Sequence, residues 1–188
     1  MQSAASSPAP ASPVPPSPLP THATPNGDGI SVGVGLVAVD VHLDFQCPFR
    51  ALEGLVAEEK IRWVVHPMNL LDAGSTTAYS TRAAAAAASA DDYGWYPRYA
   101  EALFVSQPEE GGPGLSDDEL IDLGNSVGIT DAGFAEAVHA GTYLPWPIWV
   151  AECAVRRGVA GTPSVFVDGV PVAARPGPIV LAVLATGA

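Results

Sequence analysis

Apolar and polar residues alternate along residues 36–45, which predicts a β-strand. One face of this strand is entirely apolar and consists of Val37, Val39, Val41, Leu43 and Phe45. The other face is unusually polar for a central strand and carries Ala38, Asp40, His42 and Asp44. Two interpretations of that second face are open. It is either a polar strand face near the surface, or a coupled titrating cluster of Asp40, His42 and Asp44 that leads to Cys47.

The neighbouring segments predict a β-α-β unit around this strand. Residues 30–34 are expected to form a short strand. Residues 48–59 have apolar side chains at helical spacing, and residues 61–65 are rich in β-branched and aromatic residues before His66 and Pro67 end the strand. The order strand, helix, strand implies a parallel pair with a right-handed crossover.

A long helical stretch then separates two sheet-forming parts of the chain. The helices are expected at residues 76–90 and 95–106, after the capping box of Ser116 and Glu119, and at 130–140 and 147–157. An all-helical stretch in this position is typical of an inserted helical subdomain, here at about residues 76–157.

The last part of the chain predicts a β-hairpin and a covering helix. Asp168-Gly169 is a favoured turn pair between two short apolar strands, and residues 178–185 should form a short helix. The element order therefore predicts an α/β fold, in which a β-α-β half and a β-β-α half build one mixed sheet around a helical insertion.

Composition divides the chain into an arm, residues 1–29, and a domain, residues 30–188. The arm is dominated by Pro, Ala and Ser, so we expect it to be disordered or polyproline-like. It has no basic and apolar regions like those of a signal peptide, and no later apolar run is long enough for a membrane span. As written, this favours the cytoplasm; the alternative is an extracytoplasmic protein whose upstream anchor or signal is missing from the sequence.

Charge excludes some partners. The formal net charge of −12 arises from 20 acidic against 8 basic side chains and would repel nucleic acids and anionic lipids. Pairs and runs of acidic residues at 91–92, 109–110 and 117–119 are interpreted as solvated charge. We expect no nucleic-acid partner.

The chain has only two cysteines, Cys47 and Cys153, which fit neither a disulfide scaffold nor a zinc site. We expect no metal and no cofactor. Cys47 lies between a predicted strand and a predicted helix start, where unpaired amide groups and the helix dipole favour a thiolate; Pro48 suits the first helical turn. Cys153 lies among apolar residues of a predicted helix and is interpreted as buried. Whether Cys47 and Cys153 pair is a question of geometry.

The residues from Asp44 to Phe49 resemble the DsbA-like branch of the thioredoxin superfamily, whose strand ends in an acid, an aromatic, a variable residue and then Cys-Pro-aromatic-Cys. Arg50 stands where that family carries its second, resolving cysteine. Gly161-Thr162-Pro163-Ser164, which leads into the predicted hairpin, resembles the superfamily's cis-proline loop. The resemblance implies a thioredoxin-like fold with a helical insertion.

The resemblance implies a thiol-disulfide oxidoreductase that uses one cysteine. Cys47 would form mixed disulfides with protein thiols and disulfides, or with a small thiol such as glutathione, and an external thiol would complete the exchange. Thr162 and Pro163 would hold the partner, and the supporting residues are Asp44, Pro48, Phe49 and Arg50. Arg50 either stabilises the thiolate or forms a surface ion pair. The alternatives are a redox-inactive binding module for peptides or proteins, and a glutathione-dependent transferase or isomerase.

Overall fold

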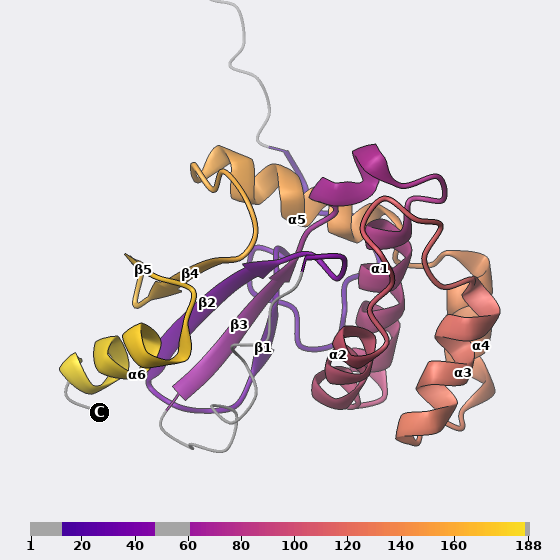
Figure 1. Cartoon of the computed structure of the whole chain (residues 1–188). Coiled ribbons are helices and arrows are strands. Elements are labelled where there is room, and N and C mark those ends of the chain that lie inside the picture. The colour runs from indigo at the N-terminus through magenta and orange to yellow at the C-terminus, as the bar shows by residue number, and fades with distance from the viewer. Residues whose placement is uncertain (1–12, 48–60, 187–188) are drawn as a thin grey trace, which may run out of the picture.

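A five-stranded mixed sheet forms the centre of the fold in the computed structural model, which describes residues 13–47 and 61–186. The strands are β1 (Ile30–Val32), β2 (Val37–Leu43), β3 (Ile61–Pro67), β4 (Ser164–Val167) and β5 (Val170–Val172). Their order across the sheet is β1-β3-β2-β4-β5, with β2 central (Figure 1). Strands β2 and β3 are parallel and the other pairs are antiparallel. The predicted mixed sheet and parallel pair are confirmed; the helix predicted at 48–59 lies outside the described residues.

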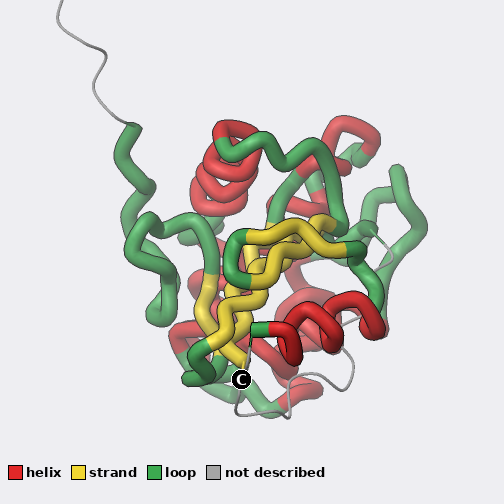
Figure 2. The backbone as a smooth tube through the Cα atoms, turned by 90° about the vertical axis from the view of Figure 1, so that its left-hand side faces the viewer, coloured by secondary structure: helices red, strands yellow, loops and turns green. Residues whose placement is uncertain are grey.

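Both faces of the sheet are covered (Figure 2). The alternating apolar residues of β2, from Val37 to Leu43, are buried as predicted. Helix α6 (Pro176–Ala185) packs on β4 and β5, and buries Ile179 and Val183. Helix α5 (Pro145–Arg156) packs on β3. Because helices cover both sides, the polar face is buried toward its end: His42 is 3% exposed and Asp44, just after β2, is fully buried, whereas Asp40 is half-buried.

The helical insertion is confirmed and lies between β3 and β4. It comprises η1 (Leu70–Gly74), α1 (Tyr79–Asp92), α2 (Tyr96–Val105), α3 (Asp117–Val127), α4 (Ala132–Ala140) and α5. Figure 1 shows α1 to α4 grouped beside the sheet, while α5 leads back to it. The predicted capping box is present, since Ser116 accepts a hydrogen bond from the Glu119 amide and the Glu119 carboxylate accepts one from the Ser116 amide.

Helix α1 is the buried centre of the insertion. Its run from Ala83 to Ala88 is at most 7% exposed. Alanine combines the highest helix propensity with the smallest side chain that retains it, so α2, α4 and α5 can all pack closely around α1. Larger rings from the surrounding segments, such as Tyr99 and Phe134, complete the core.

The predicted disordered arm is wrong for residues 21–29, which pack against the domain. Ala23 pairs with Ile30 in an isolated bridge. Trp146 of α5 donates a hydrogen bond of 2.8 Å to the Gly27 carbonyl, and Trp149 donates one of 3.2 Å to the Asn26 carbonyl. Such partners lie more than a hundred residues away, so local composition could not reveal them. Residues 1–12 lie outside the described residues.

The acidic pair at the end of α1 is not simply solvated, which corrects a second expectation. Asp91 is 3% exposed, and its carboxylate accepts hydrogen bonds from the backbone and ring of His22. Asp92 accepts from Thr21 and from the Tyr143 hydroxyl. These bonds fasten residues 21–29 to the insertion. No helix in the described ranges is long and apolar enough to cross a membrane.

Candidate active site

The turn after β2 places Cys47 at the edge of the domain, where its side chain is partly exposed. The Cys47 amide donates a hydrogen bond of 2.9 Å to the Asp44 carbonyl, which closes the turn. The Cys47 Sγ lies 3.3 Å from the carbonyl oxygen of Thr162, 115 residues further along the chain. The two motifs that carry the family resemblance therefore meet at the sulfur atom. Pro48, Phe49 and Arg50 lie outside the described residues.

Asp44 holds the turn in place. Its fully buried carboxylate accepts hydrogen bonds from the Gln46 amide at 2.9 Å, the Leu71 amide at 3.0 Å and the Ser80 hydroxyl at 2.6 Å. The last two donors belong to η1 and α1, so one side chain joins the turn to the insertion. Burial raises the pKa of Asp44, while the hydrogen bonds oppose that rise. These contacts make Asp44 a positioning residue.

The loop before β4 forms the other wall of the site. Its Thr162–Pro163 peptide bond is cis. The Ser164 hydroxyl donates a hydrogen bond of 2.7 Å to the Gly161 carbonyl, and Ser164 pairs with His42 across β4 and β2. Because β4 lies directly beside β2, the end of β2 and the start of β4 must lie together. This register is what brings Thr162 to Cys47.

The described surroundings of Cys47 do not favour the thiolate, contrary to the expectation from sequence. Burial raises the pKa of the Cys47 thiol, a hydrogen bond with the Thr162 side chain opposes that rise, and the nearby carboxylates of Asp44 and Glu110 raise the pKa further. The predicted helix start and Arg50, on which that expectation rested, lie outside the described residues.

The insertion contributes a third wall that sequence reasoning missed. The Gln107 side chain donates a hydrogen bond of 2.9 Å to the Phe45 carbonyl, two residues before Cys47. The Phe45 and Phe104 rings pack with centroids 5.1 Å apart. The segment after α2 is thus fixed beside the turn. Nothing in the local sequence signals a side-chain-to-backbone contact across 62 residues.

A second polar cluster surrounds His66 on β3, the strand beside β2. The sequence assigned this residue no chemistry. His66 Nδ1 lies 2.6 Å from the Asp28 carbonyl oxygen, and Nε2 lies 3.0 Å from Asp40 Oδ1. Because a carbonyl only accepts, Nδ1 must carry a proton. His42, which is paired with His66 in the parallel register, stacks on it. The predicted cluster of Asp40, His42 and Asp44 is therefore not one group. Asp40 and His42 contact His66, whereas Asp44 belongs to the turn before Cys47.

Cys153 is buried on α5, as predicted, with 8% of its surface exposed. Arg156 Nη2 lies 3.0 Å from its sulfur. Burial raises the pKa of the Cys153 thiol, and Arg156 opposes that rise. Both cysteines are free thiols, so Cys47 and Cys153 are not bridged in this structure. In the described parts of the chain, no three His, Cys, Asp or Glu side chains gather as a metal site.

No family model and no curated protein matches the chain. Solved structures do match. DsbA from Mycobacterium tuberculosis, in its reduced form, is 25% identical with a TM-score of 0.70, over 83% of this chain and 90% of that chain. The reduced disulfide bond oxidoreductase DsbG from the same organism is 26% identical with a TM-score of 0.69, over 84% and 86%.

A further match is MdbA from Actinomyces oris, a thiol-disulfide oxidoreductase; it is 20% identical with a TM-score of 0.68, over 90% of this chain and 89% of that chain, and supports the fold alone. The chain is thus DsbA-like, with a thioredoxin-like fold and a helical insertion.

Proposed function

We propose that this DsbA-like chain is a thiol-disulfide oxidoreductase that acts through one cysteine, Cys47. The observation that carries the proposal is the position of the Cys47 sulfur, 3.3 Å from the Thr162 carbonyl oxygen, where the two motifs of the family resemblance meet. The solved structures to which the chain is similar, DsbA and DsbG, support the same class of reaction. The proposed partners are protein thiols and disulfides.

The reaction is an exchange of sulfur–sulfur bonds. The Cys47 thiolate attacks one sulfur of a partner disulfide, a new bond forms between Cys47 and that sulfur, and the other partner sulfur leaves as a thiolate. An external thiolate then attacks the mixed disulfide and Cys47 leaves. Thr162 and Pro163 would lie along the partner's extended backbone, beside the sulfur that reacts.

The mixed disulfide should be long-lived. Arg50 occupies the position of the second cysteine of the DsbA-like pattern, and Cys153 is buried on α5, so neither is placed to attack the mixed disulfide. A thiol with a raised pKa is also a poorer leaving group, and burial raises the pKa of Cys47. Completion of the exchange therefore depends on an external thiol, for which glutathione is one candidate.

The test is a trapping experiment. The reduced protein is incubated with a disulfide-containing model protein, and adducts are located by mass spectrometry. We expect an adduct on Cys47 that an added thiol removes, no adduct with Cys47→Ser, and an unchanged adduct with the matched control Cys153→Ser. If the wild type forms no adduct, and Cys47→Ser binds the model protein as well as the wild type does, the chain is a binding module.

A further inference from the structure

We propose that the loop of residues 106–116 gives the Cys47 site a charge preference, so that it reacts faster with cationic disulfides than with anionic ones. The loop carries two exposed carboxylates, Glu109 and Glu110. The partners selected would be polypeptide cysteines flanked by Lys or Arg, and small anionic disulfides would be disfavoured. This inference rests on the proposed function of Cys47.

The first half of the loop is tied to the cysteine turn. Gln107 follows α2 directly, and its side chain donates to the Phe45 carbonyl at 2.9 Å. Glu109 lies two residues after Gln107 along the chain, and Cys47 lies two residues after Phe45. One hydrogen bond therefore holds the chain just before Glu109 and Glu110 against the chain just before Cys47.

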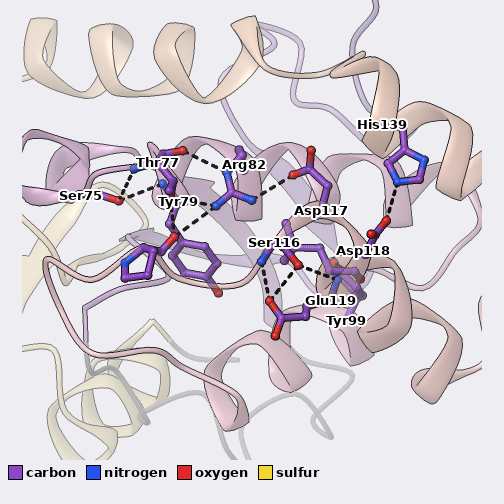
Figure 3. Close-up of polar contacts among 12 residues, drawn as sticks. Ser75, Thr77, Tyr79, Arg82, Tyr99, Ser116, Asp117, Asp118, Glu119 and His139 are labelled. Atoms are coloured by element: carbon purple, nitrogen blue, oxygen red, sulfur yellow. Dashed lines mark hydrogen bonds and ion pairs between the residues drawn. The ribbon is translucent and has the colours of Figure 1, made fainter.

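The second half of the loop is clamped to the start of α1 (Figure 3). The Ser75 hydroxyl donates to the Gly112 carbonyl at 3.2 Å. The Thr77 hydroxyl and the Arg82 guanidinium both donate to the Pro113 carbonyl. Arg82 also forms an ion pair with Asp117 at 2.9 Å, at the first residue of α3. Both ends of the loop are therefore fixed, and its first half is held beside the turn that carries Cys47.

Gly114 allows the loop to pack closely on Tyr79 of α1. It has a φ of +64°, a conformation that favours glycine, and an added Cβ would lie 2.2 Å from the Tyr79 ring. The loop backbone therefore lies directly against α1.

The charges around the sulfur are then predominantly negative among the described residues. Asp44 lies within the turn itself, and Glu109 and Glu110 lie on the solvent side. The effect of Glu110 on the pKa of Cys47 supports its proximity. Exposed charges act over about 10 Å at 0.1 M salt, so each glutamate should change rates a few-fold and the effect should weaken with salt. Arg50 is a nearby cation in sequence, and the variants below leave it unchanged.

The experiment compares three aliphatic disulfides of similar length: cystamine, which is cationic; bis(2-hydroxyethyl) disulfide, which is neutral; and dithiodipropionate, which is anionic. Second-order rates of adduct formation at Cys47 are measured by mass spectrometry. Each rate is divided by that of a neutral free thiol, N-acetylcysteinamide, to remove the intrinsic reactivity of the probe. In every case the Cys47 thiolate displaces one half of the probe as a thiolate.

We expect the normalised rates to fall from cystamine to dithiodipropionate, and the ratio of these two to approach one as salt rises. Glu110→Gln should lower the ratio about threefold, and Glu109→Gln should lower it in the same direction. The control Glu136→Gln, on α4, should leave it unchanged. A ratio near one that is insensitive to salt and to Glu110→Gln would overturn the charge preference while leaving the exchange reaction intact. Failure to react with all three probes would instead overturn the proposed function.

Discussion

The imidazole rings of His42 and His66, on the adjacent strands β2 and β3, stack face to face with centroids 4.2 Å apart and planes 7° apart. The two rings are not equivalent. His66 has an acceptor at each nitrogen, whereas both nitrogens of the buried His42 ring lack a hydrogen-bond partner among the described residues. Burial, and secondarily His66, lowers the pKa of His42 to about 3. His42 is therefore neutral in the folded protein.

This asymmetry predicts a loss of stability in mild acid. An unfolded histidine binds a proton below about pH 6.5, while folded His42 does not until about pH 3. The unfolded state thus binds more protons in this window, and the free energy of unfolding should fall with falling pH by up to about 1.4 kcal/mol per pH unit. His42→Phe, which keeps a ring on His66, should reduce this slope. Denaturant unfolding at pH 7, 6 and 5 measures it.

Asp40 should add a further loss at lower pH. Although burial opposes it, the hydrogen bond and charge of His66 hold the pKa of Asp40 below its usual value. Its contribution to stability is therefore present above the unfolded pKa of about 3.9 and is lost as the pH falls through the lower folded value.

If His42→Phe keeps the full wild-type slope between pH 6 and 5, His42 is not the group responsible for the loss of stability in mild acid.

Asp44→Ala should both destabilise the protein and disorganise the site. The change leaves the Leu71 amide and the Ser80 hydroxyl without their acceptor and should cost about 2–6 kcal/mol, because each buried group left unpaired costs about 1–3 kcal/mol. Asp44→Asn keeps one carbonyl oxygen and should cost less. Chemical denaturation gives the stability, and the alkylation rate of Cys47 reports the turn. Equal stability of wild type and Asp44→Ala would show that the buried contacts are not needed.

Arg50→Cys tests whether only the second sulfur is missing. The change restores Cys-Pro-Phe-Cys, in which two sulfurs one helical turn apart can close a disulfide if the backbone follows the DsbA-like pattern. The variant should gain activity in a disulfide-reduction assay on a model protein, while the wild type should only accumulate mixed disulfides. A variant that closes the bridge, as shown by mass spectrometry, yet exchanges no faster than background would mean that the rest of the site does not support dithiol chemistry.

Trp146→Phe should loosen residues 21–29. The phenyl ring keeps much of the buried surface but removes the hydrogen bond to the Gly27 carbonyl, which should cost about 1 kcal/mol. Because Trp146 takes no part in the hydrogen bonds described around the Cys47 turn, the rate of mixed-disulfide formation should not change. Hydrogen exchange of the segment compares the variant with wild type. Identical exchange in both would indicate that the hydrogen bond does not hold the segment.

The sequence by itself determined the elements and their order. Alternation in β2, the alanine run of α1, the capping box at Ser116 and the turn at Asp168-Gly169 all depend on residues within one or two turns of each other. The family resemblance, carried by two motifs in the order the fold requires, also predicted that Cys47 and Thr162 lie together, and their atoms are 3.3 Å apart.

Only the tertiary structure decided which residues surround Cys47 and in what state. Hydrogen bonds such as those from Ser80 to Asp44 and from Gln107 to the Phe45 carbonyl join residues 36 and 62 positions apart, and no local pattern encodes such pairs. The same holds for residues 21–29, whose composition suggests disorder until the tryptophans of α5 are placed against them. Burial also depends on the complete fold, because the rings packed on His42, those of His66 and Phe166, come from the two neighbouring strands. A pKa follows from burial and neighbouring charge, and both are properties of the assembled domain.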